Sequence, residues 1–102
     1  MKLLAIEKEL IRVNWEEENE VLINEAYRVY ELFQEGTVRE IYLNENENAV
    51  IILECNSSDK AHEVLATLPL VKAGFISFDI MELHPYTGFS RILLKKGQQS
   101  WH

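Results

Sequence analysis

Residues 37–55 decide the fold: they read Thr-Val-Arg-Glu-Ile-Tyr-Leu, then Asn-Glu-Asn-Glu-Asn, then Ala-Val-Ile-Ile-Leu-Glu-Cys. The two outer segments are rich in β-branched and aromatic residues, which favour extended strands. The five residues between them are polar and typical of a turn. Two strands joined by so short a turn form an antiparallel hairpin. The sequence therefore predicts a hairpin with strands at residues 37–43 and 49–55.

An α-helix is predicted before this hairpin. Its apolar residues recur at spacings of four, three and four, which is one face of a helix, and neighbouring apolar residues widen that face: Leu22, Ala26, Val29 and Phe33, widened by Ile23 and Tyr30. Asn14 stands before the acidic run 16–20 as a candidate N-cap, and carboxylates favour the start of a helix. Gly36 stands just past the last apolar residue, where a left-handed C-cap is expected.

A second helix and two further strands complete the predicted domain. Ser57 or Ser58 can cap a helix that Pro69 ends, and its apolar stripe consists of Ala61, Val64, Leu65 and Leu68. Residues 2–10 are predicted as the first strand and residues 75–84 as the last, which Pro85 stops. We therefore expect one domain over residues 1–94. Residues 95–102 have no hydrophobic period and are expected to be a mobile tail.

The order β-α-β-β-α-β is that of a ferredoxin-like fold, in the α+β class. Such a fold has a four-stranded antiparallel sheet with both helices on one face. The last strand carries apolar residues on both sides, with Ile76, Phe78 and Ile80 on one and Phe75 and Met81 on the other. A sheet that is apolar on both faces needs a cover. We expect that cover to be a second copy, which gives an obligate homodimer in which two sheets form a dimeric α/β barrel.

Composition narrows the functional classes. The chain of 102 residues has a formal net charge of −7, 47% hydrophobic residues and a single cysteine. An acidic surface repels phosphate backbones, so nucleic-acid binding is not expected. One cysteine excludes an intramolecular disulfide framework, and no apolar run approaches the ~20 residues that span a bilayer. The apolar stretch before Glu7 is too short for a secretory signal. We expect a cytoplasmic protein without membrane contact.

Three short segments resemble the muconolactone isomerase-like group of dimeric α/β-barrel proteins: Glu35-Gly36-Thr37-Val38-Arg39, Leu68-Pro69-Leu70 and His84-Pro85. The resemblance covers roughly residues 20–90 in element order. It implies a cofactor-free isomerase that moves a proton in a lactone, and dimers that assemble into larger rings. Thr37, Arg39 and His84 match family positions.

Strand alternation assigns candidate site residues to the face turned away from the helices. Ile41, Leu43, Ile51, Leu53 and Cys55 are expected under the helices. The opposite face is expected to hold Val38, Glu40, Tyr42, Val50, Ile52 and Glu54, joined by Phe75, Ser77, Asp79 and Met81, with Glu7 as a further candidate. Carboxylates in a partly apolar cavity have raised pKa values, which suits a general base near neutral pH.

An enolising isomerase needs a base and a donor to the developing oxyanion. We expect Glu54 to be the base, Tyr42 or Arg39 the donor, and His84 a second proton carrier at the barrel mouth. Glu40, Ser77, Asp79 and Met81 are the expected substrate-lining residues. The three histidines have no metal-ligand spacing, and neither a metal nor another cofactor is expected.

Four questions stay open at this point. The carboxylates can instead pair with Lys8, Arg12 or Arg39, in which case they are structural. The protein can be a non-catalytic dimeric module that binds a small ligand or a protein, because one fold hosts many functions, or a monooxygenase-like barrel. The aromatic residues Tyr86 and Phe89, with residues 92–94, can pack on a partner chain or on their own subunit.

Overall fold

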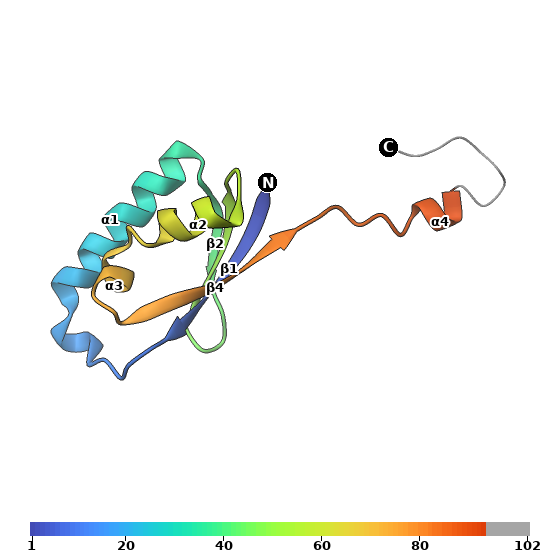
Figure 1. The fold of residues 1–102 in the computed structure, drawn as a ribbon. Coiled ribbons are helices and arrows are strands. Elements are labelled where there is room, and N and C mark those ends of the chain that lie inside the picture. The colour runs from blue at the N-terminus through green and yellow to red at the C-terminus, as the bar shows by residue number, and fades with distance from the viewer. Residues whose placement is uncertain (94–102) are drawn as a thin grey trace.

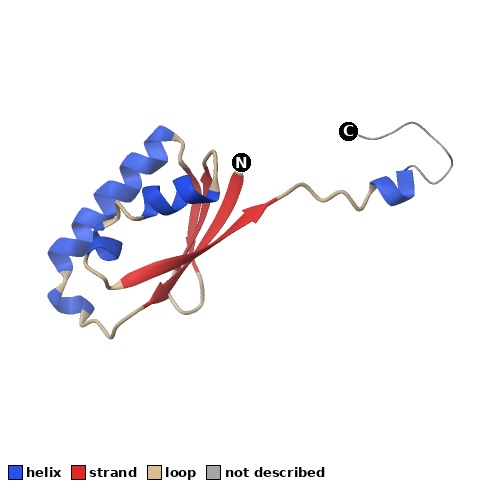
Figure 2. Ribbon diagram, viewed as in Figure 1, coloured by secondary structure: helices blue, strands red, loops and turns tan. Residues whose placement is uncertain are grey.

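The computed structural model describes residues 1–93, which fold into one sheet covered by helices on one face (Figures 1 and 2). The strands are β1 (Lys2–Glu9), β2 (Val38–Leu43), β3 (Ala49–Glu54) and β4 (Ile76–Leu83). The helices are α1 (Asn19–Glu35), α2 (Ser58–Leu65), α3 (Pro69–Lys72) and α4 (Ser90–Leu93), with a 3-10 turn η1 (Trp15–Glu17) before α1. The expected mobile tail, residues 95–102, lies outside the described residues.

The sheet confirms the α+β class and the four-stranded antiparallel topology. Its strand order is β2-β3-β1-β4, and β1 pairs antiparallel with both β3 and β4. Figure 2 shows α1, α2 and α3 together on one side of the sheet and no described element on the other. This is the predicted ferredoxin-like arrangement, with a short α3 inserted before β4.

The core lies between the sheet and the helices. Its buried side chains come from alternate strand positions, from one position of α1, from two positions of α2 and from the turn before α3. They include Leu3, Ile51, Leu53, Leu32, Leu65 and Leu68. Alternation places Leu3 beside Leu53, and Ala5 beside Ile51. Burying one such side chain contributes roughly 1.5–3 kcal/mol, so this layer supplies most of the driving force for folding.

The ends of the helices follow their sequence signals, with one correction. Gly36 has a φ of +85° at the end of α1 and its N–H bonds to the Phe33 carbonyl. The hydroxyl of Ser57 accepts a hydrogen bond from the Lys60 N–H at 3.0 Å. Pro69, expected to end the second helix, instead opens α3, because a proline is tolerated in the first turn where its missing N–H is not needed.

The start and the inner face of the first helix also differ from expectation. Asn14 caps only η1 and makes no side-chain hydrogen bond there, and α1 begins at Asn19. The one fully buried α1 side chain is Leu32, which the predicted stripe missed, whereas Ala26 and Phe33 are exposed. The helix is therefore rotated relative to the predicted apolar face, and an apolar stripe stays on its outer side.

The second face of the sheet is open and largely apolar at its centre. Leu4 lies beside Ile52 and Met81, and Ile6 lies beside Val50. We call this surface, formed by the side chains of all four strands that point away from the helices, the open face. No described residue of the chain covers it. The solvated face of an antiparallel sheet is ordinarily polar, so this apolar centre marks a surface that a further layer can cover.

Residues 84–93 form an arm that continues the direction of β4 and leaves the body of the domain (Figure 1). Within the described residues, the backbone hydrogen bonds of Ser90, Arg91, Ile92 and Leu93 stay inside the arm. The arm ends in the single turn of α4, which was not predicted.

A half-buried carboxylate joins α1 to α3. The Glu25 carboxylate accepts a hydrogen bond from the Leu70 N–H at 3.0 Å. Burial raises the pKa of Glu25, the Leu70 hydrogen bond opposes that rise, and the charge of Glu7 adds to it. The pKa of Glu7 is also raised, mainly by burial. A raised pKa in the folded state means that the native protein holds the proton more strongly than the unfolded chain.

We predict that Glu25→Gln removes a contribution that stabilises the native protein more at low pH than at neutral pH. In the native chain the contribution of Glu25 is fully present below its unfolded pKa and is lost as pH rises through the raised folded pKa. Glutamine keeps the acceptor for Leu70 but does not titrate, so the stability at pH 4 minus that at pH 7, measured by urea unfolding, should be smaller than in the native chain. Glu25→Leu removes the acceptor and should destabilise at both pH values by about 1–3 kcal/mol. Equal pH slopes for Glu25→Gln and the native chain would contradict this assignment.

Candidate functional site

The open face holds most of the side chains that the sequence placed there. Glu40 lies beside Ile52, and Tyr42 lies beside Val50, on neighbouring strands. Glu54 and Lys2 are partners, as are Asp79 and Ile6, and Ser77 and Lys8. With Met81, these residues put acidic and hydroxyl groups around an apolar centre.

Three expected members of this face lie elsewhere. Val38 is 2% exposed and pairs with Leu53, because a bulge between Val38 and Glu40 shifts the alternation of β2 by one residue. Glu7 lies on the helix side, where its carboxylate accepts a hydrogen bond from the Ala49 N–H. Phe75 precedes β4 and contacts Trp15 edge-to-face. A bulge has no clear sequence signal here, so alternation alone could not have placed Val38.

Tyr42 and Glu40 form a direct pair on the open face. The Tyr42 hydroxyl donates a hydrogen bond to the Glu40 carboxylate at 2.6 Å. This bond and the charge of Glu40 raise the pKa of Tyr42 above 10.0. Tyr42 therefore stays protonated at neutral pH and keeps a hydroxyl proton that it can donate.

Glu54 is ionised rather than poised near neutrality. Its carboxylate pairs with the amino group of Met1. This hydrogen bond is the largest influence and lowers the pKa of Glu54; burial opposes it, and the charges of the amino terminus, Arg39 and Lys2 lower the pKa further. The expected raised pKa is therefore wrong for the single chain, because the open face is not covered and the carboxylate has cationic neighbours.

The polar residues of β4 on the open face are arranged as structural groups rather than as catalytic ones. Asp79 pairs with Lys8 at 2.9 Å, on the surface, which is the structural alternative that the sequence left open. The Ser77 hydroxyl is buried and has no hydrogen-bond partner among the described residues. Arg39 does not pair with a carboxylate within bonding distance, since its Nε donates to the Gly36 carbonyl instead.

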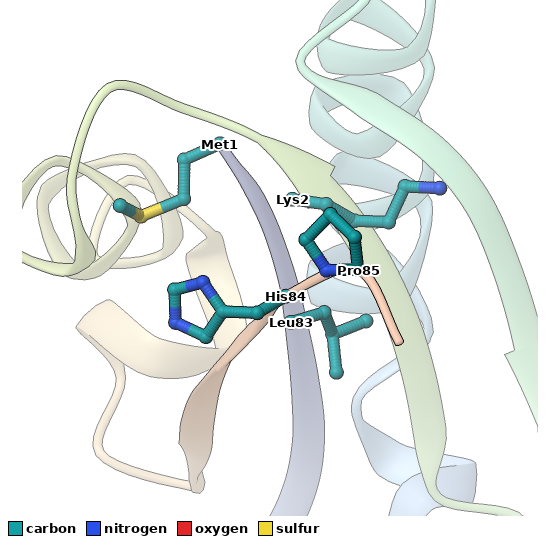
Figure 3. Close-up of a pocket in the computed structure, with 5 residues that line it drawn as sticks. All are labelled: Met1, Lys2, Leu83, His84 and Pro85. Carbon is teal, nitrogen blue, oxygen red and sulfur yellow. The ribbon is translucent and has the colours of Figure 1, made fainter. Parts of the chain in front are cut away.

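His84 lies at the end of the sheet, beside a cavity of about 450 Å³ that Met1, Lys2, Leu83 and Pro85 also line. In Figure 3 the imidazole lies on the same side of β1 as Met1, whereas Lys2, Leu83 and Pro85 lie on the other side. Its Nε2 is 3.3 Å from a carboxylate oxygen of Glu82. The structure therefore does not bring His84 onto the open face beside Glu54.

Sequence reasoning missed Lys2 and the apolar centre contributed by β1. Leu4 and Ile6 alternate with the buried Leu3 and Ala5 in the sequence, which was a usable signal for a strand apolar on both faces. Lys2 gave no such signal. Its position became visible only through the register that sets it between Glu54 and Leu83.

Two further properties concern the described residues only. Among residues 1–93 no group of three or more His, Cys, Asp or Glu side chains is placed to hold a metal ion. None of the helices in that range is both long and apolar enough to cross a membrane.

The whole fold is similar to the folds of two solved structures. Muconolactone isomerase superposes with a TM-score of 0.71 at 17% identity, over 85% of this chain and 92% of that one. The chain has the muconolactone isomerase fold. A 5-chloro-2-hydroxyhydroquinone dehydrochlorinase from Burkholderia phenoliruptrix AC1100, solved with 2,5-dihydroxybenzoquinone, superposes with a TM-score of 0.61 at 16% identity, over 86% and 98% of the two chains. These likenesses confirm, at the level of the fold, the resemblance given by the three short segments.

Sequence comparison adds nothing to this likeness. No protein-family model matches the chain, and no curated protein is significantly similar to it. The muconolactone isomerase fold is therefore shared at low sequence identity, and the chemistry of the site has to be argued from its own residues.

We predict that Glu40→Gln lowers the pKa of Tyr42 toward 10.0, because the charged acceptor that stabilises the protonated phenol is removed. The measurement is an NMR titration of the tyrosine ring carbons. Glu63→Gln, an exposed change on α2, is the matched control and should leave the Tyr42 titration where it is. An unchanged Tyr42 titration in Glu40→Gln would show that the pair does not form in solution.

Proposed function

We propose that the protein is a homodimer whose two open faces enclose a binding site for a small lactone or related carbonyl compound. The apolar centre of the face supports this proposal, because a contiguous exposed apolar patch marks a contact surface. A second copy of the same chain is present in any solution of the protein and can cover this face. Enclosure between two such faces also brings polar groups of both protomers around one cavity, as a binding site requires.

In this site Glu54 is the proposed base and Tyr42 the proposed oxyanion donor. Glu54 aligns with Lys2, and Tyr42 with Val50, four residues away from Glu54 along β3. At about 3.4 Å per residue their strand positions lie roughly 14 Å apart, which leaves room for one small ring between the two side chains. Glu40 stands between them and holds the Tyr42 hydroxyl.

The proposed reaction is an isomerisation by proton transfer. The Glu54 carboxylate removes a proton from the carbon beside the carbonyl, and the electron pair moves onto the carbonyl oxygen as an enolate. Tyr42 turns its hydroxyl from Glu40 to that oxygen. Glu54 then returns the proton to another carbon of the conjugated system, which gives the isomer without any cofactor. Covering the face with a second sheet excludes water, and burial of that kind raises the pKa of a carboxylate toward neutrality.

Further members of the open face are proposed to contact the substrate. Met81 supplies an apolar wall, and Glu40, Ser77 and Asp79 supply polar groups on the two sides of the apolar centre. Arg39 and His84 lie away from these residues in the single chain. We propose that a second copy approaches them at the ends of the sheet. Larger rings of dimers and a cytoplasmic location belong to the same proposal, the latter compatible with the one free, buried cysteine, Cys55.

We predict that Ile52→Lys converts the dimer into a folded monomer. The change puts a charge at the centre of the open face, where pairing with a second sheet would bury it without a partner. Light scattering of the native chain should give twice the mass of 11.9 kDa, or an even multiple of it where dimers assemble into rings. The control His62→Lys, exposed on α2, should stay dimeric. A native chain that is monomeric at micromolar concentration would contradict the enclosed site.

We predict that a thermal-shift screen of muconolactone, related lactones and small aromatic acids finds a ligand that stabilises the protein. Saturation at a hundredfold excess over Kd adds about 2.7 kcal/mol. For a compound that is also turned over, Glu54→Gln should lower kcat/KM by about 100-fold or more, as expected for the loss of a general base. Tyr42→Phe should lower it by about 100-fold, and Glu63→Gln should leave it unchanged. Binding without turnover would favour a non-catalytic ligand-binding module, and the absence of binding would contradict the proposal.

A further inference from the structure

One acidic residue stands within an apolar face of α1. Leu22, Ala26, Val29 and Phe33 recur at helical spacing, and Glu25 lies on the same face, three residues after Leu22 and four before Val29. A surface helix is normally apolar along such a face, because the face turns toward the core. In α1 part of this face stays outside the core, with Phe33 exposed and Glu25 half-buried. A carboxylate therefore lies among apolar side chains at the surface of the domain.

These side chains line a groove between α1 and the edge strand β2, which we call the α1–β2 groove. Its volume of about 540 Å³ is within the range of small-molecule sites. Among the described residues that line it, Glu25 is the only charged one, and the others are apolar or aromatic: Leu22, Ala26, Val29, Tyr30, Phe33 and Ile41. Ile41 pairs with the buried Ile51, so the groove is on the helix side of the sheet. It is therefore separate from the open face.

The Glu25 carboxylate has no cationic partner within residues 1–93. Its Oε1 accepts a hydrogen bond from a neutral donor, the Leu70 N–H, at 3.0 Å. None of the ion pairs formed by the described residues includes Glu25. Its second oxygen is not among the buried atoms that lack a partner, so solvent reaches it. A half-buried carboxylate loses hydration, and a nearby positive charge is what compensates that loss.

The nearest cation along α1 is held away from Glu25. Arg28 follows Glu25 by three residues, a spacing at which helical side chains can pair. Its Nε instead donates to the Thr67 hydroxyl at 2.9 Å, and its Nη1 lies 3.5 Å from the Glu31 carboxylate. Burial raises the pKa of Glu25, and the charge of Glu7 raises it further. Two carboxylates therefore contribute to a negative potential that no cation of the described chain neutralises.

The rest of the groove fits an apolar body next to a positive charge. Tyr30 and Phe33 are 59% and 52% exposed, and aromatic rings attract cations to their faces and pack against apolar groups. From Glu25 to Phe33 the helix rises by roughly 12 Å. The small side chain of Ala26 leaves the groove open and also lines a neighbouring hollow of about 340 Å³. A ligand with its charge at Glu25 has an apolar surface of this length beside it.

We propose that the α1–β2 groove binds an amphipathic amine, whose ammonium group pairs with Glu25 and whose apolar body lies along α1 toward Phe33. The ammonium donates to the carboxylate oxygen that solvent now reaches, while Leu70 keeps its hydrogen bond to the other oxygen. A neutral compound of the same shape leaves the carboxylate uncompensated, and an anionic one is repelled by it. This site goes beyond the proposed isomerase reaction and does not depend on the dimer.

Three probes with one carbon skeleton test the proposal: 4-phenylbutylamine, 4-phenylbutan-1-ol and 4-phenylbutyrate. Each is titrated into the intact native chain, and binding is followed by the NMR shifts of backbone amides. The dissociation constant of the amine should be lower than that of the alcohol by at least about tenfold, and the carboxylate should not bind. The shifted amides should include those of Ala26, Tyr30 and Ile41. Equal affinity for amine and alcohol, shifts spread over the whole acidic surface, or no binding of the amine would overturn the proposal.

Two variants separate the charge from the shape of the groove. Glu25→Gln keeps the acceptor for Leu70 and should weaken the amine by about tenfold or more, while the affinity for the alcohol stays unchanged. Ala26→Trp, at an exposed position, fills the groove and should weaken both probes. The control Glu63→Gln, exposed on α2, changes the net charge equally and should alter neither affinity.

The variants are compared at equal far-ultraviolet circular dichroism. Undiminished amine binding in a folded Glu25→Gln variant would overturn the ion pair. Undiminished binding in Ala26→Trp would overturn the location, and this second variant decides the question if Glu25→Gln does not fold. Because the groove and the open face lie on opposite sides of the sheet, loss of amine binding in either variant should leave lactone binding unchanged.

Discussion

The half-buried apolar layer at the centre of the open face is the constraint on which the rest of the structure depends. Leu4, Ile6, Val50 and Ile52 occupy the centre of a sheet whose other face is already fully used by the core. The helices cannot cover both faces of a four-stranded sheet in a chain of this length. We propose that a second copy supplies the layer that covers this centre, and that this cover determines what the polar groups around it can do.

The chemistry of the site follows from that cover. In the single chain Glu54 is held ionised by the amino group of Met1, and Tyr42 is held protonated by Glu40. These are the charge states that a base and an oxyanion donor need at the start of an enolisation. In the proposed dimer, enclosure would remove the water around Glu54, and this burial would raise its pKa and make it a stronger base.

Sequence reasoning predicted the topology well, because strong local signals agreed with the tertiary contacts. The hairpin of residues 37–55, the Gly36 cap and the Ser57 cap each depend on a few neighbouring residues. Sequence reasoning failed where the local structure depends on residues that are far apart in the sequence. The bulge that turns Val38 inward, the rotation of α1 that buries Leu32 and the position of His84 all depend on packing and strand register. The open face was predicted in outline, but the partners that set the pKa of Glu54 were not.

The most direct test of the account is to measure solvent access at the centre of the open face in the intact protein. A soluble paramagnetic probe broadens the NMR signals of methyl groups that solvent can reach. The account predicts that the methyl signals of Leu4, Ile6 and Ile52 are protected, while those of the exposed Leu10 and Ile11 are broadened. Equal broadening of both sets would show that nothing covers the face, and would contradict the dimer and the enclosed site together.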